Sequence, residues 1–240
     1  MAAEVPEHSR WDQLLLGGAL AILAGIVVNQ AILAKAVIPP LLVFAILLVA
    51  ALALRRARWR AGTIATGVVA AFVLLGSIPF VLEDLSHPAS APAQFAVTVL
   101  ILAGVISTVT AAVALLRRWG DRPAYRLGAA LSVLFVVAAA VGFGLASGGD
   151  DDATSTGDVA VEAKNVAFNP KDVQVTSGGA VFVTNADLIR HTFTVKGQPL
   201  DVEVPAGRSR RIAITLPPGS YPLHCSVLGH EQMKGTLTVR

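Results

Sequence analysis

Five long apolar stretches fill the first half of the chain, and they restrict its fold more than any other feature. They cover residues 14–34, 37–54, 61–82, 95–116 and 127–146. A helix rises about 1.5 Å per residue, so each stretch can cross a hydrocarbon core about 30 Å thick. The whole chain is 54% hydrophobic and 15% charged, whereas about a quarter of the residues are charged in soluble proteins. The sequence therefore predicts an α-helical transmembrane bundle of about five spans over residues 1–146.

Arginines between the apolar stretches predict the orientation of this bundle. One cluster separates the second stretch from the third and another separates the fourth from the fifth: Arg55, Arg56, Arg58 and Arg60, then Arg117, Arg118, Arg122 and Arg126. The intervening loop carries Glu83, Asp84 and His87 without Lys or Arg. Because Lys and Arg gather in cytoplasmic loops, we expect both clusters on the cytoplasmic side. The chain after the fifth stretch should then lie outside.

The sequence also indicates whether the first span is cleaved and whether the bundle has a role beyond anchoring. Glu4, Glu7 and Asp12 precede or begin the first span, which lacks a basic leader and a clear cleavage site, so we expect it to remain uncleaved. Residues 29–40 separate the first span from the second. If this stretch were instead part of a single crossing, only the side of the membrane on which the N-terminus lies would change. No span carries a charged residue at its centre or any histidine. The bundle is therefore predicted to be an anchor and not an ion path or a haem site.

Beyond the bundle the pattern changes from helical to alternating. Residues 147–157, SGGDDDATSTG, are small and acidic and predict a flexible linker. Residues 158–240 predict an all-β Greek-key sandwich of seven or eight short strands separated by Gly and Pro turns. The expected strands are residues 159–163, 173–176, 181–184, 191–195, 210–216, 220–225 and 236–239.

The last strands carry a set of potential metal ligands. Cys225, His230 and Met233 follow the spacing C-x4-H-x2-M, and His191 lies upstream on another strand, from which we expect it to complete the site across the sandwich. One thiolate, two imidazoles and one thioether are the ligands of a type 1 copper site. Zinc is the rival metal for one Cys and two His, but a thioether is a poor zinc ligand.

Two of the predicted copper ligands could have other roles, and the remaining histidines are not expected to bind the metal. Met233 could fill a gap in the core, as single methionines often do. His191 alone could be a hydrogen-bonded strand residue. His224 is expected to point away from Cys225, because successive strand residues face opposite sides. His8 and His87 have no soft ligands near them in the sequence and are left out of the site.

From Phe168 onward the chain resembles the cupredoxin family, particularly small plastocyanin-like domains of prokaryotes. The motifs FNPKDVQV, VFVTNADLIRHTF and LPPGSYPLHCSVLGHEQMKGTLTV occur in the order found in that family and cover about the last third of the chain. The resemblance implies one type 1 copper ion, with His191, Cys225 and His230 as strong ligands and Met233 as a weak axial ligand. The interval from His230 to Met233 is two residues shorter than in several plastocyanin-like proteins, although intervals of two also occur.

These observations predict a membrane-anchored type 1 copper protein that carries or relays single electrons at the outer face of the cytoplasmic membrane. By analogy with the family, an apolar patch around His230 would meet a redox partner protein: Leu188, Ile189, Val227 and Leu228. A copper ion with all positions filled leaves no place for an organic substrate, so we do not expect an enzyme. The net charge of +3 gives little support for nucleic-acid binding. The alternative is a module for copper storage, sensing or delivery without electron transfer.

Overall fold

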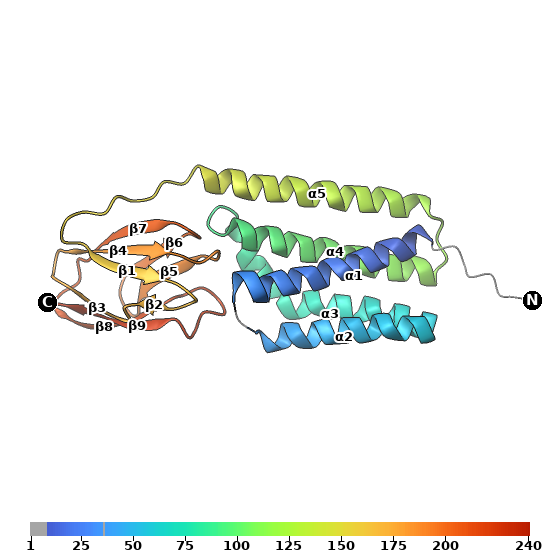
Figure 1. Cartoon of the computed structure of the whole chain (residues 1–240), viewed down its shortest axis with the longest axis horizontal. Helices are drawn as coiled ribbons and strands as arrows, with labels where there is room; N and C mark the ends of the chain where they lie inside the picture. The colour runs from blue at the N-terminus through green and yellow to red at the C-terminus, as the bar shows by residue number, and fades with distance from the viewer. Residues whose placement is uncertain (1–8, 36) are drawn as a thin grey trace, which may run out of the picture. The chain divides into compact units, whose positions relative to one another are not determined.

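The computed structural model describes residues 9–35 and 37–240. It divides into two compact units, Met1–Leu82 with Ala96–Ala140 and Glu83–Phe95 with Val141–Arg240. Glu4, Glu7 and His8, which the sequence analysis considered, lie outside the described residues. Figure 1 shows the helices of the first half and the strands of the second.

Within its described residues the first half forms five long helices, as the sequence predicts. Their bounds are α1 Arg10–Val28, continued by the π-helical segment η1 Asn29–Leu33, then α2 Pro39–Ala57, α3 Trp59–Ser86, α4 Pro92–Leu116 and α5 Arg122–Ser147. All five are long and apolar enough to cross a membrane. The uncertain boundary at residues 29–40 contains a break, because η1 ends at Leu33 and α2 begins at Pro39. Proline suits the first helical position, where its missing N–H has no helical partner. The first two stretches are therefore two helices.

Small residues let α1 and α4 approach closely. A Cβ added to Gly18 of α1 would lie 2.7 Å from the Gly104 carbonyl oxygen, and one added to Gly104 of α4 would lie 2.7 Å from the Gly18 carbonyl oxygen. Such contacts between glycines are a common way to pack apolar helices when burial in lipid provides no driving force between them. Ser9 caps α1 through its side chain, which accepts a hydrogen bond from the Asp12 N–H. Asp12 in turn pairs with Arg55 of α2.

The second half is a β-sandwich with nine strands among the described residues (Figure 1). One sheet has the order β2-β1-β4-β7 and the other β3-β9-β8-β5-β6. The pairs β1–β4 and β3–β9 are parallel and the rest are antiparallel. The bounds are β1 Val159–Ala163, β2 Phe168–Asn169, β3 Asp172–Val175, β4 Ala180–Asn185, β5 His191–Val195, β6 Leu200–Val204, β7 Ser209–Ala213, β8 Gly219–His224 and β9 Lys234–Val239.

The core of the sandwich follows from the alternation of residues along the strands. In β1, β3 and β9 every second side chain near the middle or end of the strand is buried, because successive residues face opposite sides of a sheet. Phe168 and Phe193 meet edge to face between the layers, with ring centroids 5.9 Å apart. All seven predicted strands are present. The sequence analysis missed β2, which has two residues, and β6, whose sequence LDVEV carries two acidic residues.

The acidic segment before the sandwich makes defined contacts with β7, the last strand of its sheet. The Asp152 N–H donates to the Ser209 carbonyl, while the Ser209 N–H donates to Asp151 Oδ1 over 2.7 Å. The Arg211 N–H donates to Asp152 Oδ2 over 2.8 Å. Composition alone predicts a flexible linker here. It does not show that Asp151 and Asp152 satisfy free backbone groups of a neighbouring strand.

Candidate metal centre

Three of the four predicted ligands converge at one end of the second sheet. His191 is the first residue of β5, Cys225 directly follows β8, and His230 lies in the loop before β9. The potential ligand atoms of these three residues all lie within 4.8 Å of one another. Strands β5 and β8 are direct neighbours with Thr194 opposite His224. The expectation that His191 reaches the site from across the sandwich is therefore wrong, because the two ligand-bearing strands belong to one sheet.

The distances between these atoms suit a single metal ion. Cys225 Sγ lies 3.9 Å from His191 Nδ1 and 3.5 Å from His230 Nδ1. Bonds of about 2.3 Å to sulfur and 2.1 Å to nitrogen, with an angle of about 120°, separate the two ligand atoms by about 3.8 Å. The two rings face the same space, with centroids 5.0 Å apart and an angle of 48° between their planes.

Met233 lies beside these residues at the end of the ligand loop. The Cys225 N–H donates to the Met233 carbonyl over 3.0 Å, and the Met233 N–H donates to the His230 carbonyl over 2.8 Å. These two bonds close the loop, so its first and last residues meet. The Met233 side chain is fully buried. Its position in the chain and its burial fit both the axial ligand and the core residue considered from the sequence.

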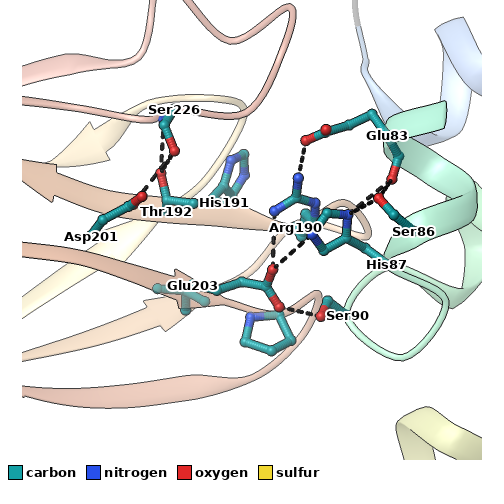
Figure 2. Close-up of polar contacts among 12 residues, drawn as sticks. Glu83, Ser86, His87, Ser90, Arg190, His191, Thr192, Asp201, Glu203 and Ser226 are labelled. Atoms are coloured by element: carbon teal, nitrogen blue, oxygen red, sulfur yellow. Dashed lines mark hydrogen bonds and ion pairs between the residues drawn. The ribbon is translucent and has the colours of Figure 1, made fainter. Parts of the chain in front are cut away.

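The Cys225 sulfur is buried and lies beside two donor groups of Thr192 in β5. The Thr192 N–H points to Cys225 Sγ over 3.3 Å, and the Thr192 hydroxyl lies 3.8 Å from it. The same hydroxyl accepts the Ser226 N–H over 2.7 Å and contacts the Ser226 hydroxyl, as Figure 2 shows. Burial raises the pKa of the Cys225 thiol. A bound cation offsets this effect, because it stabilises the thiolate form.

A buried carboxylate orients His191. Asp187 Oδ2 lies 3.0 Å from His191 Nε2, and both side chains are almost fully buried. Burial alone favours the protonated acid. The N–H groups of Val166 and Asn165 together with His191 outweigh that effect and lower the pKa of Asp187. Burial also lowers the pKa of His191, so its neutral form is favoured. A neutral imidazole with one nitrogen bonded to a carboxylate is a common arrangement for a metal ligand.

Asn185 holds the segment that carries both Asp187 and His191. Its side-chain amide donates to the carbonyls of Ile189, Val204 and Pro205 over 2.9 to 3.1 Å. Its Oδ1 accepts the Asp187 N–H over 2.9 Å. Neither Asn185 nor Asp187 is among the residues predicted from the sequence. The run Asn185-Ala186-Asp187 before a potential ligand was the available signal, because Asn and Asp often bond to nearby backbone.

Of the three clustered residues, His230 is the nearest to solvent, being partly buried where His191 is fully buried. Burial and the neighbouring His191 lower the pKa of His230 to about 4. Leu188 and Leu228 are 48% and 40% exposed, and they are the large exposed hydrophobic residues among the described part of the sandwich. Ile189, expected in the same patch, is buried. It precedes β5, where its side chain turns into the core.

An ion-pair cluster lies beside His191 within the same compact unit (Figure 2). The largely buried guanidinium of Arg190 pairs with Glu83 and Glu203. Glu203 also bonds to Ser90 and lies 3.7 Å from His87 Nε2. His87 thus belongs to this cluster and not to the metal-ligand group. His224 is also absent from that group among the described residues, and it is less buried than its neighbours Leu223 and Cys225.

The C-terminal part of the chain is similar to a known protein family. A family model described as "Cupredoxin-like domain" matches residues 132–239. The C-terminal region is a cupredoxin-like domain. The match begins within α5 and ends at the last residue of β9, so the family likeness covers the whole sandwich and none of α1 to α4. No curated protein matches the chain significantly.

Solved structures similar to the cupredoxin-like domain include two kinds of protein. The oxidised state of an amicyanin mutant is 18% identical, with 36% of this chain and 86% of that chain covered and a TM-score of 0.33. The copper-containing nitrite reductase from Thermus scotoductus SA-01 is 26% identical, with 38% of this chain covered and a TM-score of 0.31. The likeness spans only 24% of the nitrite reductase chain.

Proposed function

We propose that this protein is a membrane-anchored type 1 copper protein that carries or relays single electrons at the outer face of the cytoplasmic membrane. One observation supports this most strongly. In a cupredoxin-like domain, the potential ligand atoms of His191, Cys225 and His230 lie within 4.8 Å of one another, and the buried Met233 closes the same loop.

The residues fit copper in their chemistry as well as their spacing. Thiolate and thioether sulfur are soft ligands suited to Cu(I), whereas imidazole suits both oxidation states. His191, Cys225 and His230 would hold the ion strongly, and Met233 would be the weak axial ligand. When bound, copper would supply reversible uptake and release of one electron.

The surroundings of the ligands suit electron transfer more than catalysis. His191 and Cys225 are held by neighbouring strands; Cys225 also accepts a hydrogen bond from the Thr192 N–H, and His191 is hydrogen-bonded to the Asp187 carboxylate. Ligands that keep their positions when the charge of the metal changes make electron transfer easier. With four protein ligands, the site has no position for an organic substrate, so we propose no enzymatic activity.

Leu188 and Leu228 supply a candidate docking surface for a redox partner protein. Both are exposed, and each lies three residues or fewer from a proposed ligand in the sequence. A small apolar patch favours short-lived encounters, because limited buried area gives weak binding. Replacing both leucines by serine should slow electron exchange with a partner while leaving the copper spectrum unchanged.

In this proposal the helices anchor the protein in the membrane, and the loops between them determine the side on which the cupredoxin-like domain lies. Large apolar side chains are exposed along all five helices, as expected for surfaces that face lipid. The arginine clusters at residues 55–60 and 117–126 would lie in the cytoplasm. A reporter enzyme fused after Arg240 should therefore be active only outside the cytoplasm. Activity of that fusion in the cytoplasm would contradict the proposed orientation.

The decisive test is the colour of the copper-loaded chain. A Cu(II)–thiolate bond should give the purified full-length protein an intense visible absorption band. Cys225→Ser replaces the soft thiolate by a hydroxyl that binds copper poorly, so the band should disappear and copper affinity should fall. His224→Ala is the matched control, since it removes a histidine next to Cys225 that lies outside the ligand group. A colourless wild-type chain, or a coloured Cys225→Ser variant, would refute the copper assignment.

A second measurement separates electron transfer from copper handling. The copper-loaded chain should be reduced and reoxidised reversibly, and it should keep its metal in the presence of a competing chelator. A coloured chain that passes its copper to a chelator faster than it exchanges electrons would instead be a storage or delivery module.

A further inference from the structure

The buried carboxylate of Asp187 is held from several sides. Its exposed fraction is 2%, so water contributes little to its solvation. Oδ1 accepts the Asn165 N–H over 2.9 Å, and Oδ2 accepts the Val166 N–H over 3.0 Å. Three or more donors around a carboxylate favour its charged form, because an ionised carboxylate only accepts hydrogen bonds. Asp187 is therefore built to carry a negative charge inside the sandwich.

The same carboxylate fixes which nitrogen of His191 carries the proton. Oδ2 lies 3.0 Å from Nε2, so Nε2–H donates to Asp187. In a neutral imidazole the other nitrogen then has a free lone pair. That nitrogen, Nδ1, is the one that lies 3.9 Å from Cys225 Sγ. The Asp187 contact thus prepares the ligand atom of His191 before any metal binds.

We propose that Asp187 is a positioning residue that holds His191 in the Nε2–H tautomer and that its charge favours Cu(II) over Cu(I) at the site. This inference rests on the proposed copper function. A buried negative charge stabilises the more positively charged metal more strongly, so it lowers the reduction potential. Residues that orient a ligand histidine in this way typically change metal affinity about ten- to a hundredfold when altered.

The alternative hypothesis, that Asp187 has only a structural role, predicts a different result. If Asp187 did no more than tie the segment before β5 to Asn165 and Val166, its loss would lower stability and leave the potential of the folded protein unchanged. Asp187→Asn distinguishes the two, because the amide has nearly the same size and keeps one acceptor oxygen but loses the charge. Glu162→Gln is the matched control, since Glu162 is a half-exposed carboxylate on β1 of the same domain.

The first arm of the test needs neither copper nor a variant at Asp187. Nitrogen NMR of the metal-free, full-length chain in detergent reports the histidine tautomers, and a His191→Asn sample identifies the His191 signals. We expect His191 as the neutral Nε2–H tautomer at pH 7. A neutral ring with the proton on Nδ1 would overturn the inference, whether or not the protein binds copper.

The second arm measures the potential of the copper-loaded full-length chain by titration of the visible band. Asp187→Asn should lower the ratio of Cu(II) to Cu(I) affinity at least tenfold, which raises a one-electron potential by at least about 59 mV. Glu162→Gln should leave the potential near that of the wild type. Equal potentials for wild type and Asp187→Asn would overturn the inference while leaving the copper site intact. A wild-type chain without the visible band would instead refute the proposed function, and the tautomer would still decide the positioning role.

Discussion

Replacement of Asn185 by alanine should loosen the metal centre through a residue that touches no proposed ligand directly. Asn185 ends β4 and is 1% exposed. Its side chain donates to the carbonyls of Ile189, Val204 and Pro205 and accepts the Asp187 N–H. The alanine variant loses all of these contacts at once, within the segment that leads to His191.

The size of the effect follows from the groups left without partners. A hydrogen bond contributes about 0.5–1.5 kcal/mol net, and a buried group left unsatisfied costs about 1–3 kcal/mol. The Asp187 N–H and the three carbonyls depend on Asn185 to different degrees, since a carbonyl can accept from elsewhere. We therefore expect the free energy of unfolding of the sandwich to fall by about 3–5 kcal/mol. At about 1.4 kcal/mol per factor of ten, this raises the open fraction roughly a hundredfold or more.

Cys225 provides the assay, because it is the single cysteine in the chain and is 4% exposed. In the metal-free, full-length protein a thiol reagent can modify Cys225 only when the sandwich opens. When opening and closing are fast, the labelling rate is proportional to the open fraction. Asn185→Ala should therefore be labelled roughly a hundred times faster than the wild type, or more, at the same pH and reagent concentration.

Gln198→Ala is the control for this measurement. Gln198 is also an amide residue of the sandwich, but it is exposed in the turn between β5 and β6, and its backbone N–H makes the turn contact. Its labelling rate should match that of the wild type. Equal rates for Asn185→Ala and wild type would show that the four contacts of Asn185 do not hold this end of the sandwich.

Two further changes test the site in other ways. Met233→Leu should keep copper bound but raise the reduction potential, because loss of the thioether disfavours Cu(II) more than Cu(I); an unchanged potential and spectrum would make Met233 a core residue. Acid should destabilise the metal-free sandwich. Burial lowers the pKa of His230 to about 4, whereas an unfolded histidine titrates near about 6.5, so the unfolded state binds more protons between these values. The free energy of unfolding should fall as the pH drops from about 6.5 to 4, by on the order of 3 kcal/mol. A denaturant midpoint that is constant over this range would contradict the burial of His230.

The five helices could be predicted because an apolar stretch of about 20 residues identifies a membrane-spanning helix without information from the rest of the chain. It also predicted seven strands, since alternation identifies a strand with one buried face. The short β2 and the acidic β6 carry too little of that signal. Residues 150–152 have the composition of a linker, and only the fold brings them next to the backbone of Ser209 and Arg211.

The candidate site was predictable to a similar extent. His191, Cys225 and His230 could be found because few residue types bind copper and their spacing suits strands. Asp187 and Asn185 gave only a weak signal, because Asp and Asn occur in many turns and their role depends on which backbone groups the fold brings to them. The pairing of β5 with β8 was likewise invisible, since alternation gives the face of a strand and not its neighbour.

The contact between the acidic segment and β7 has a consequence for the proposed anchoring of this protein in a membrane. The outermost strand of a sheet offers unpaired N–H and C=O groups that can pair with the same strand of another copy. Proteins confined to a plane meet one another often, and an open edge would invite such pairing. Asp151 and Asp152 occupy backbone positions at Ser209 and Arg211. Arg208 pairs with Asp151 at the same edge, so the protection comes from the occupied backbone groups and not from net charge. The segment thus occupies backbone groups through which a second copy could otherwise pair with β7.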